Sequence, residues 1–74
     1  MNEKLILETL ANHTDRLAGL QYAIAGLTAV IESRLPNLST DQRETLQKSV
    51  EIQKREAETL KSGAEHLRQV LQNL

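Results

Sequence analysis

The sequence has no cysteine, no phenylalanine and no tryptophan, and its only aromatic residue is Tyr22. The absence of cysteine excludes disulfide bonds and thiolate zinc sites. Chains of about this length, 74 residues, bury a modest fraction of their surface and commonly depend on a cross-link, a metal or an oligomer for stability. Because sulfur cross-links are excluded, self-association is the expected source of stability.

An excess of charge of one sign is also missing. Nine basic and ten acidic residues give a net charge of −1, whereas nucleic-acid-binding domains carry clustered Lys and Arg. The six bases after Pro36 interleave with six acids, a pattern that is typical of a solvated helix face. We therefore expect no nucleic-acid partner.

No apolar run is long enough to cross a membrane. The longest uncharged apolar segment covers the 15 residues 17–31, between Arg16 and Glu32, whereas a helix needs about 20 residues to cross the bilayer core. Acidic residues precede this segment, so it does not follow the basic leader of a secretory signal. We expect a cytoplasmic protein without a membrane partner.

Helical periodicity runs through residues 2–34 and again through residues 39–73. Between them, Pro36 pushes Leu35 out of the α region, and Ser39 with Gln42 has the spacing of a capping box. A connection as short as residues 35–38 makes neighbouring helices antiparallel. The sequence therefore predicts an all-α fold, a single domain over residues 1–74 that forms an antiparallel, coiled-coil-like hairpin of two helices.

Apolar residues repeat at coiled-coil spacing in both predicted helices. When the chain is folded back at Pro36, one register pairs these positions, for example Leu27 with Leu46 and Leu17 with Ala57. We therefore expect them to form a seam inside the hairpin. The predicted seam consists of Ile6, Leu10, Leu17, Leu20, Ile24, Leu27, Leu46, Val50, Ala57, Leu60, Ala64, Leu67 and Leu71.

A second stripe, made mostly of small residues, lies on the first predicted helix away from this seam. The second helix has no counterpart, so a lone hairpin would leave the stripe in water. Two copies packed stripe to stripe would cover it as a four-helix bundle with the first helices inside, and another protein could dock there instead. We expect a homodimer, with a tetramer as the alternative. The small-residue stripe consists of Ala18, Gly19, Tyr22, Ala23, Ala25, Gly26, Ala29 and Val30.

No residue pattern points to catalysis, a cofactor or a metal. Catalysis needs several groups in a preformed pocket, and two long helices with a short turn offer little of that. His13, on the predicted seam, has no second ligand beside it, so we interpret it as a polar residue near the open end and not as a pH-sensitive switch. Gln53 either fixes the register of the seam or lies at its wet edge.

These features predict a non-enzymatic protein–protein interaction module, a small homo-oligomeric hairpin that binds or modulates another protein. Bacterial accessory proteins and phage-encoded modulators have this size and simplicity. A purely structural, self-assembling oligomer is the alternative. The two-helix outline, without any shared motif, is also similar to that of the small chaperones that hold secretion-needle subunits, which implies an export or assembly chaperone as a further alternative.

Overall fold

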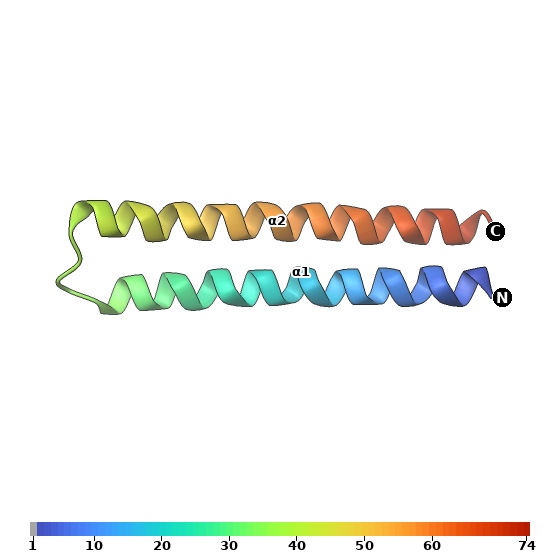
Figure 1. Cartoon of the computed structure of the whole chain (residues 1–74), viewed down its shortest axis with the longest axis horizontal. Helices are drawn as coiled ribbons and strands as arrows, with labels where there is room; N and C mark the ends of the chain where they lie inside the picture. Colours follow the sequence, from blue (N-terminus) through green and yellow to red (C-terminus); the bar gives the residue numbers. More distant parts are fainter. Residues whose placement is uncertain (1) are drawn as a thin grey trace.

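The computed structural model describes residues 2–74 and is a hairpin of two long helices (Figure 1). α1 spans Glu3–Arg34 and α2 spans Thr40–Gln72, and they lie side by side in opposite directions, with both chain ends at the same end. The hairpin measures 56 × 14 × 14 Å. The predicted all-α hairpin is therefore confirmed. α1 begins one residue later than predicted, and α2 is one residue shorter at each end.

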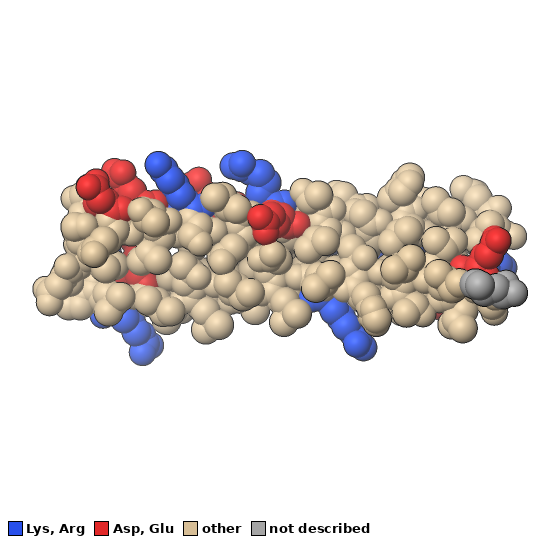
Figure 2. Space-filling view, viewed as in Figure 1, with Lys and Arg blue, Asp and Glu red and all other residues tan. Residues whose placement is uncertain are grey.

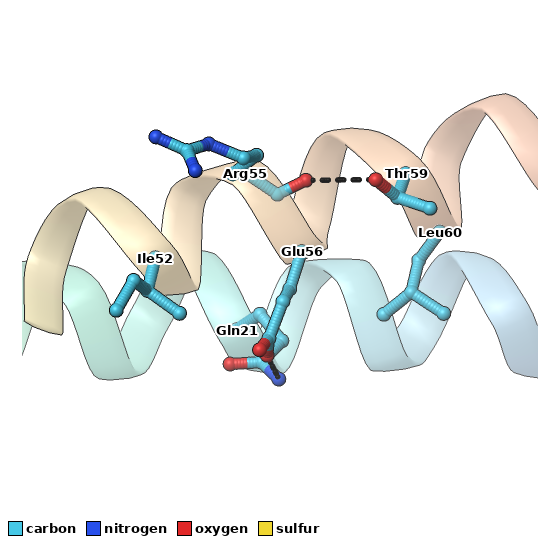
Figure 3. Close-up of a pocket in the computed structure, with 6 residues that line it drawn as sticks. All are labelled: Gln21, Ile52, Arg55, Glu56, Thr59 and Leu60. Atoms are coloured by element: carbon cyan, nitrogen blue, oxygen red, sulfur yellow. Dashed lines mark hydrogen bonds between the residues drawn. The ribbon is translucent and has the colours of Figure 1, made fainter.

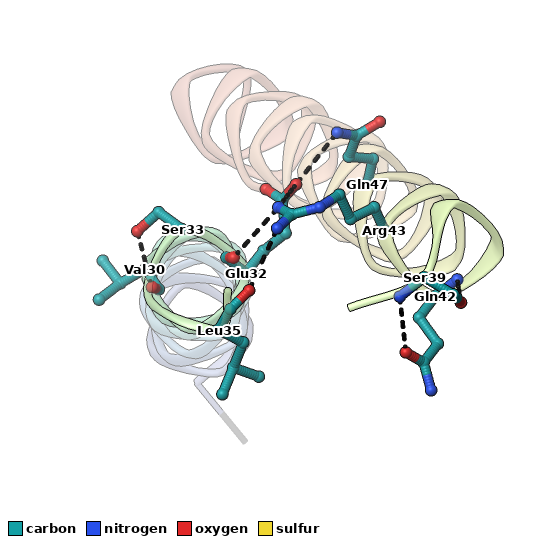
Figure 4. Close-up of polar contacts among 8 residues, drawn as sticks. All are labelled: Val30, Glu32, Ser33, Leu35, Ser39, Gln42, Arg43 and Gln47. Atoms are coloured by element: carbon teal, nitrogen blue, oxygen red, sulfur yellow. Dashed lines mark hydrogen bonds and ion pairs between the residues drawn. The ribbon is translucent and has the colours of Figure 1, made fainter. Parts of the chain in front are cut away.

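Each helix begins at a side chain that caps it. Asn2 Oδ1 accepts a hydrogen bond from the backbone N–H of Leu5 at 3.2 Å. Ser39 Oγ accepts from the N–H of Gln42 at 3.1 Å, and Gln42 Oε1 accepts from the N–H of Ser39 at 2.9 Å (Figure 4). This reciprocal pair confirms the predicted capping box. The bonds satisfy N–H groups that have no acceptor inside the helix.

Arg43, in the first turns of α2, ties the connection to the end of α1 (Figure 4). Its guanidinium donates to the carbonyl oxygens of Leu35 at 3.1 Å and Glu32 at 3.5 Å, and it lies 3.5 Å from the Glu32 carboxylate. Glu32 also accepts from Gln47 Nε2 at 3.1 Å. Carbonyl groups at a helix C-terminus lack partners within the helix and carry partial negative charge. Arg43 therefore both satisfies the end of α1 and holds α2 beside it.

The core between the helices is a line of alanines. Ala25, Ala57 and Ala64 are 0% exposed, Ala11 is 1% exposed and Ala18 is 4% exposed. Among residues 2–74 no large side chain is fully buried. Small side chains let the helix backbones approach closely, which increases dispersion contacts between them. The half-buried residues around the alanines include Leu7, Thr14, Gln21 and Thr28 on α1 and Leu46, Val50, Leu60, Leu67 and Leu71 on α2.

The structure corrects the α1 half of the predicted seam. The large residues assigned to it are between 43% and 63% exposed, and α1 turns Ala11, Ala18 and Ala25 toward α2 instead. α1 contains two series at heptad spacing, about 100° apart around its axis. Hydrophobicity favours the series with larger residues, whereas close packing favours the alanines. The residues corrected are Ile6, Leu10, Leu17, Leu20, Ile24 and Leu27.

α2 presents to α1 the series that the sequence indicated, with Ala57 and Ala64 buried. The helix continues through Gly63 without interruption. Gln53 is half-buried in this series, and within the described residues its Oε1 is buried without a hydrogen-bond partner. An unpaired buried acceptor lowers stability. Gln53 is therefore a weak point of the interface between the helices.

Candidate interaction surface

Seven large aliphatic residues lie along one side of α1, outside the interface with α2. They alternate at spacings of three and four residues, and His13 occupies the position between Leu10 and Leu17. This spacing places them on one face of a helix. Their exposed fractions lie between 43% and 63%. We call this set the α1 stripe: Ile6, Leu10, Leu17, Leu20, Ile24, Leu27 and Ile31.

The α1 stripe is large for a surface left in water. At these exposed fractions its side chains present on the order of 600 Å² of apolar surface, the upper end of what a typical monomer exposes in one patch. Of the fourteen exposed large hydrophobic residues described, ten lie on α1 and two, Ile52 and Val70, lie on α2. The excess of apolar surface predicted for the first helix is therefore present in the structure. This excess lies on the large aliphatic residues of α1.

Charged side chains stand mostly along the edges of the broad face shown in Figure 2, and much of that face is uncharged. Interfaces between proteins show this arrangement, with few charges at the centre of the contact and polar groups at its rim. The face in Figure 2 thus has few charged side chains, one acidic group near its middle among them.

A hollow of about 540 Å³ lies along the groove between the helices (Figure 3). Gln21 Nε2 donates to Glu56 Oε2 across it at 2.9 Å, and Ile52 and Leu60 supply apolar walls. Thr59 Oγ1 donates to the carbonyl of Arg55 and so is occupied within α2. The walls of the hollow are therefore apolar at Ile52 and Leu60, and the side chains of Gln21 and Thr59 are bonded within the hairpin.

A second hollow, of about 450 Å³, lies beside the turn. Ile31, the last residue of the α1 stripe, lines it together with Leu35, Leu38 and Leu46. Asp41, Gln42 and Thr45 form its remaining wall. The α1 stripe therefore ends in an apolar depression at the turn end of the hairpin.

Hydrogen bonds also join the helices outside the alanine core. Arg68 lies 2.5 Å from the Asp15 carboxylate and donates to Asn12 Oδ1 at 3.2 Å. Tyr22 donates its phenolic hydrogen to Glu58. This hydrogen bond, followed by desolvation and the negative charge of Glu58, raises the pKa of Tyr22 above its ordinary value. These contacts fix how α1 and α2 are rotated relative to each other.

The structure divides the small-residue stripe that the sequence proposed as an interface. Ala18 and Ala25 are corrections, because they are buried within the hairpin and are not available to a partner. Tyr22 is 37% exposed and is bonded to Glu58. The remaining members are exposed on α1: Gly19, Ala23, Gly26, Ala29 and Val30.

Sequence reasoning missed Ala11 as a core residue and Ile31 as part of the exposed surface. The signal for Ala11 was its position seven residues before Ala18, which continues the alanine series by two turns. His13 is exposed on the α1 stripe. Within residues 2–74, no three His, Asp or Glu side chains gather where they could hold a metal ion.

Comparison with protein-family models, with curated proteins and with solved structures gave no match in any of the three. Over the described part of the chain, neither helix has a stretch that is both long and apolar enough to cross a bilayer.

Proposed function

We propose that the protein is a non-enzymatic protein–protein interaction module of the cytoplasm, and that the α1 stripe is its contact surface. One observation carries the proposal: seven large aliphatic side chains form a row along α1, interrupted once at His13, that α2 does not cover. Apolar patches of this size mark interaction sites on soluble proteins. The row lies along one face of α1, the arrangement by which an amphipathic helix docks its apolar face against a partner.

The thin core supports the same proposal. Among residues 2–74, only alanines are fully buried between α1 and α2, and burial of apolar surface is the main favourable contribution to folding. A chain that leaves its larger aliphatic residues outside gains stability when a partner covers them. A second copy is one such partner, because two copies paired stripe to stripe form a four-helix bundle with the two α1 helices inside; another protein seated on the stripe is the other.

The test is affinity purification from the native host with three forms of the tagged protein. Leu20→Arg places a charge in the middle of the α1 stripe, and Ser62→Arg places the same charge on an exposed position of α2 as the matched control. Circular dichroism checks that each variant remains helical. We expect wild type and Ser62→Arg to retain the same partner protein, and Leu20→Arg to lose it.

Retention of that partner by a folded Leu20→Arg protein would contradict the assignment of the surface. Recovery of the protein's own untagged copies alone, by wild type and by Ser62→Arg, would instead identify a purely structural oligomer. The two results separate the proposed interaction module from the self-assembling alternative.

A further inference from the structure

We infer that the occupant of the α1 stripe is the same stripe of a second copy, packed antiparallel about a two-fold axis level with Ala18 and Gly19. This inference rests on the proposed function and deepens it, because it names one partner and one arrangement. Closed two-fold dimers are the commonest homo-oligomers, and their interface must be complementary to itself.

The spacing of the α1 stripe has that self-complementarity. In antiparallel helix pairs, the two alternating positions of the apolar row meet each other across the interface. A single register pairs Leu17 with Leu20 of the partner subunit, Leu10 with the partner's Leu27, and Ile6 with the partner's Ile31. Every layer is then filled, and the row ends at the same level in both copies.

His13 distinguishes this arrangement from a parallel one. In the antiparallel register it lies opposite Ile24 of the partner subunit, so the two histidines fall in different layers. A parallel pair would bring both His13 side chains into the same layer and would set two polar rings against each other where the row is otherwise aliphatic. Burying polar groups without compensating partners is unfavourable. The sequence of the stripe therefore favours the antiparallel pair.

The edge of the stripe is compatible with the same register. Arg16 lies beside the row, and the antiparallel pairing sets it near Ala23 of the partner subunit, so no like charge opposes it. Like charges placed opposite each other weaken helix pairing. The pairing thus introduces no electrostatic conflict at the one basic residue next to the centre of the contact.

The hollow beside the turn gives a second, independent reason. It is lined by Ile31 together with Leu35, Leu38 and Leu46, and the antiparallel register brings Ile6 of the partner subunit to Ile31. The amino-terminal end of the partner's α1 would therefore lie over an apolar depression. In a parallel pair, the hollow of one copy would face the hollow of the other, and neither would be filled.

The available area also suits a second copy. A standard interface buries roughly 800 Å² on each partner, and the α1 stripe alone exposes on the order of 600 Å². The α2 flank contributes Ile52, which is 52% exposed beside the hollow of Figure 3. A two-helix hairpin of the same length and the same row can cover this surface from end to end.

The experiment combines mass in solution with cysteine cross-linking, which is clean because the chain has no native cysteine. Sedimentation should give twice the chain mass of 8.3 kDa. His13→Cys and Ile24→Cys are made separately, one of them with a size tag, then mixed, allowed to exchange and treated with a short bismaleimide. In the proposed register only the mixed dimer brings the two cysteines into one layer.

Each single variant alone should not cross-link, because residues 13 and 24 lie eleven positions apart, about 16 Å along a helix. A mixture of His13→Cys with Leu10→Cys is the control and should also fail, since both cysteines lie at the same end of α1. Leu17→Arg should raise the dimer dissociation constant about a hundredfold or more.

Three results would overturn the inference: a monomer at all concentrations tested, cross-linking of His13→Cys to itself, or a dimer that Leu17→Arg leaves intact. A monomer that still loses its host partner on Leu20→Arg substitution would overturn this arrangement while leaving the proposed function standing. An antiparallel dimer whose Leu20→Arg variant keeps the host partner would support the arrangement and contradict the proposed contact surface for that partner.

Discussion

Leu17 and Ala18 are adjacent in the chain and lie on different faces of α1: Ala18 is 4% exposed against α2, whereas Leu17 is 52% exposed. The hairpin therefore packs through its small residues and leaves the large ones outside. The alanine row sets how closely α1 and α2 approach, and the α1 stripe is the surface that we propose for a partner.

The alanine row predicts that larger side chains are not tolerated between the helices. Ala25 is 0% exposed, so Ala25→Leu must push the helices apart, and we expect it to lower the free energy of unfolding by about 1–3 kcal/mol. Ala23→Leu is the matched control, because Ala23 is exposed on the same helix. Urea unfolding, monitored by circular dichroism, measures the free energy of unfolding of both variants. Equal stability of the two variants would show that α1 is rotated differently.

Substitution of Gln53 is expected to raise the stability of the hairpin, whereas substitution of Ala25 lowers it. Its Oε1 is buried without a hydrogen-bond partner in the part of the chain that the structure describes, and an unpaired buried acceptor costs roughly 1–3 kcal/mol. Gln53→Leu removes this group and should raise the melting temperature, whereas Gln69→Leu, an exposed position on the same helix, should leave it unchanged. A lower melting temperature for Gln53→Leu would mean that the amide fixes the register of the hairpin.

Local features of the fold could be predicted from the sequence, and the rotation of α1 could not. Pro36 and the pair Ser39 and Gln42 determine the turn and the start of α2 through neighbours in the chain. The choice between Leu17 and Ala18 depends on how closely two helices approach. Both rows have helical periodicity, so the sequence pattern cannot tell which one packs against α2. Hydrophobicity then favours the row with the larger residues.

The sequence predicted that the first helix has an excess of apolar surface, but it assigned that surface to the small residues. The sequence shows that the first helix has more apolar residues than the second can cover, and the structure shows the same excess. It places that excess on the α1 stripe because the alanines are taken up by α2. The hydrogen bond between Tyr22 and Glu58 could not be predicted from the sequence, because it also depends on the rotation of α1.

Substitution of Gly26 distinguishes binding through the α1 stripe from binding through the small-residue stripe. An added Cβ at Gly26 meets nothing within 4 Å, and alanine in place of glycine inside a helix contributes about 0.5–1 kcal/mol. If partners bind through the α1 stripe, Gly26→Ala should raise the stability of the hairpin and leave the mass of the assembly unchanged. If copies instead pack closely on the small residues, the same substitution should dissociate them. Sedimentation beside thermal unfolding distinguishes the outcomes.

Tyr22 supplies a spectroscopic measure of how the helices are rotated. It is the only aromatic residue, so the absorbance change of tyrosinate reports one group. The hydrogen bond to Glu58 raises the pKa of Tyr22, and Glu58→Gln should return that pKa toward the ordinary value of about 10. Glu56→Gln is the matched control, because Glu56 accepts from Gln21 and not from Tyr22.

The raised pKa of Tyr22 determines how the contact with Glu58 makes the stability of the hairpin depend on pH. The folded chain favours the neutral phenol, so the contribution of this contact to stability is complete below the unfolded pKa of about 10 and is lost as the pH rises through the higher folded value. Because Tyr22 is 37% exposed, water screens the contact, and the titration of Tyr22 is a better readout than the melting temperature. Identical titration curves for wild type and Glu58→Gln would show that Tyr22 and Glu58 are not in contact, and that the rotation of α1 which buries Ala18 and exposes Leu17 is wrong.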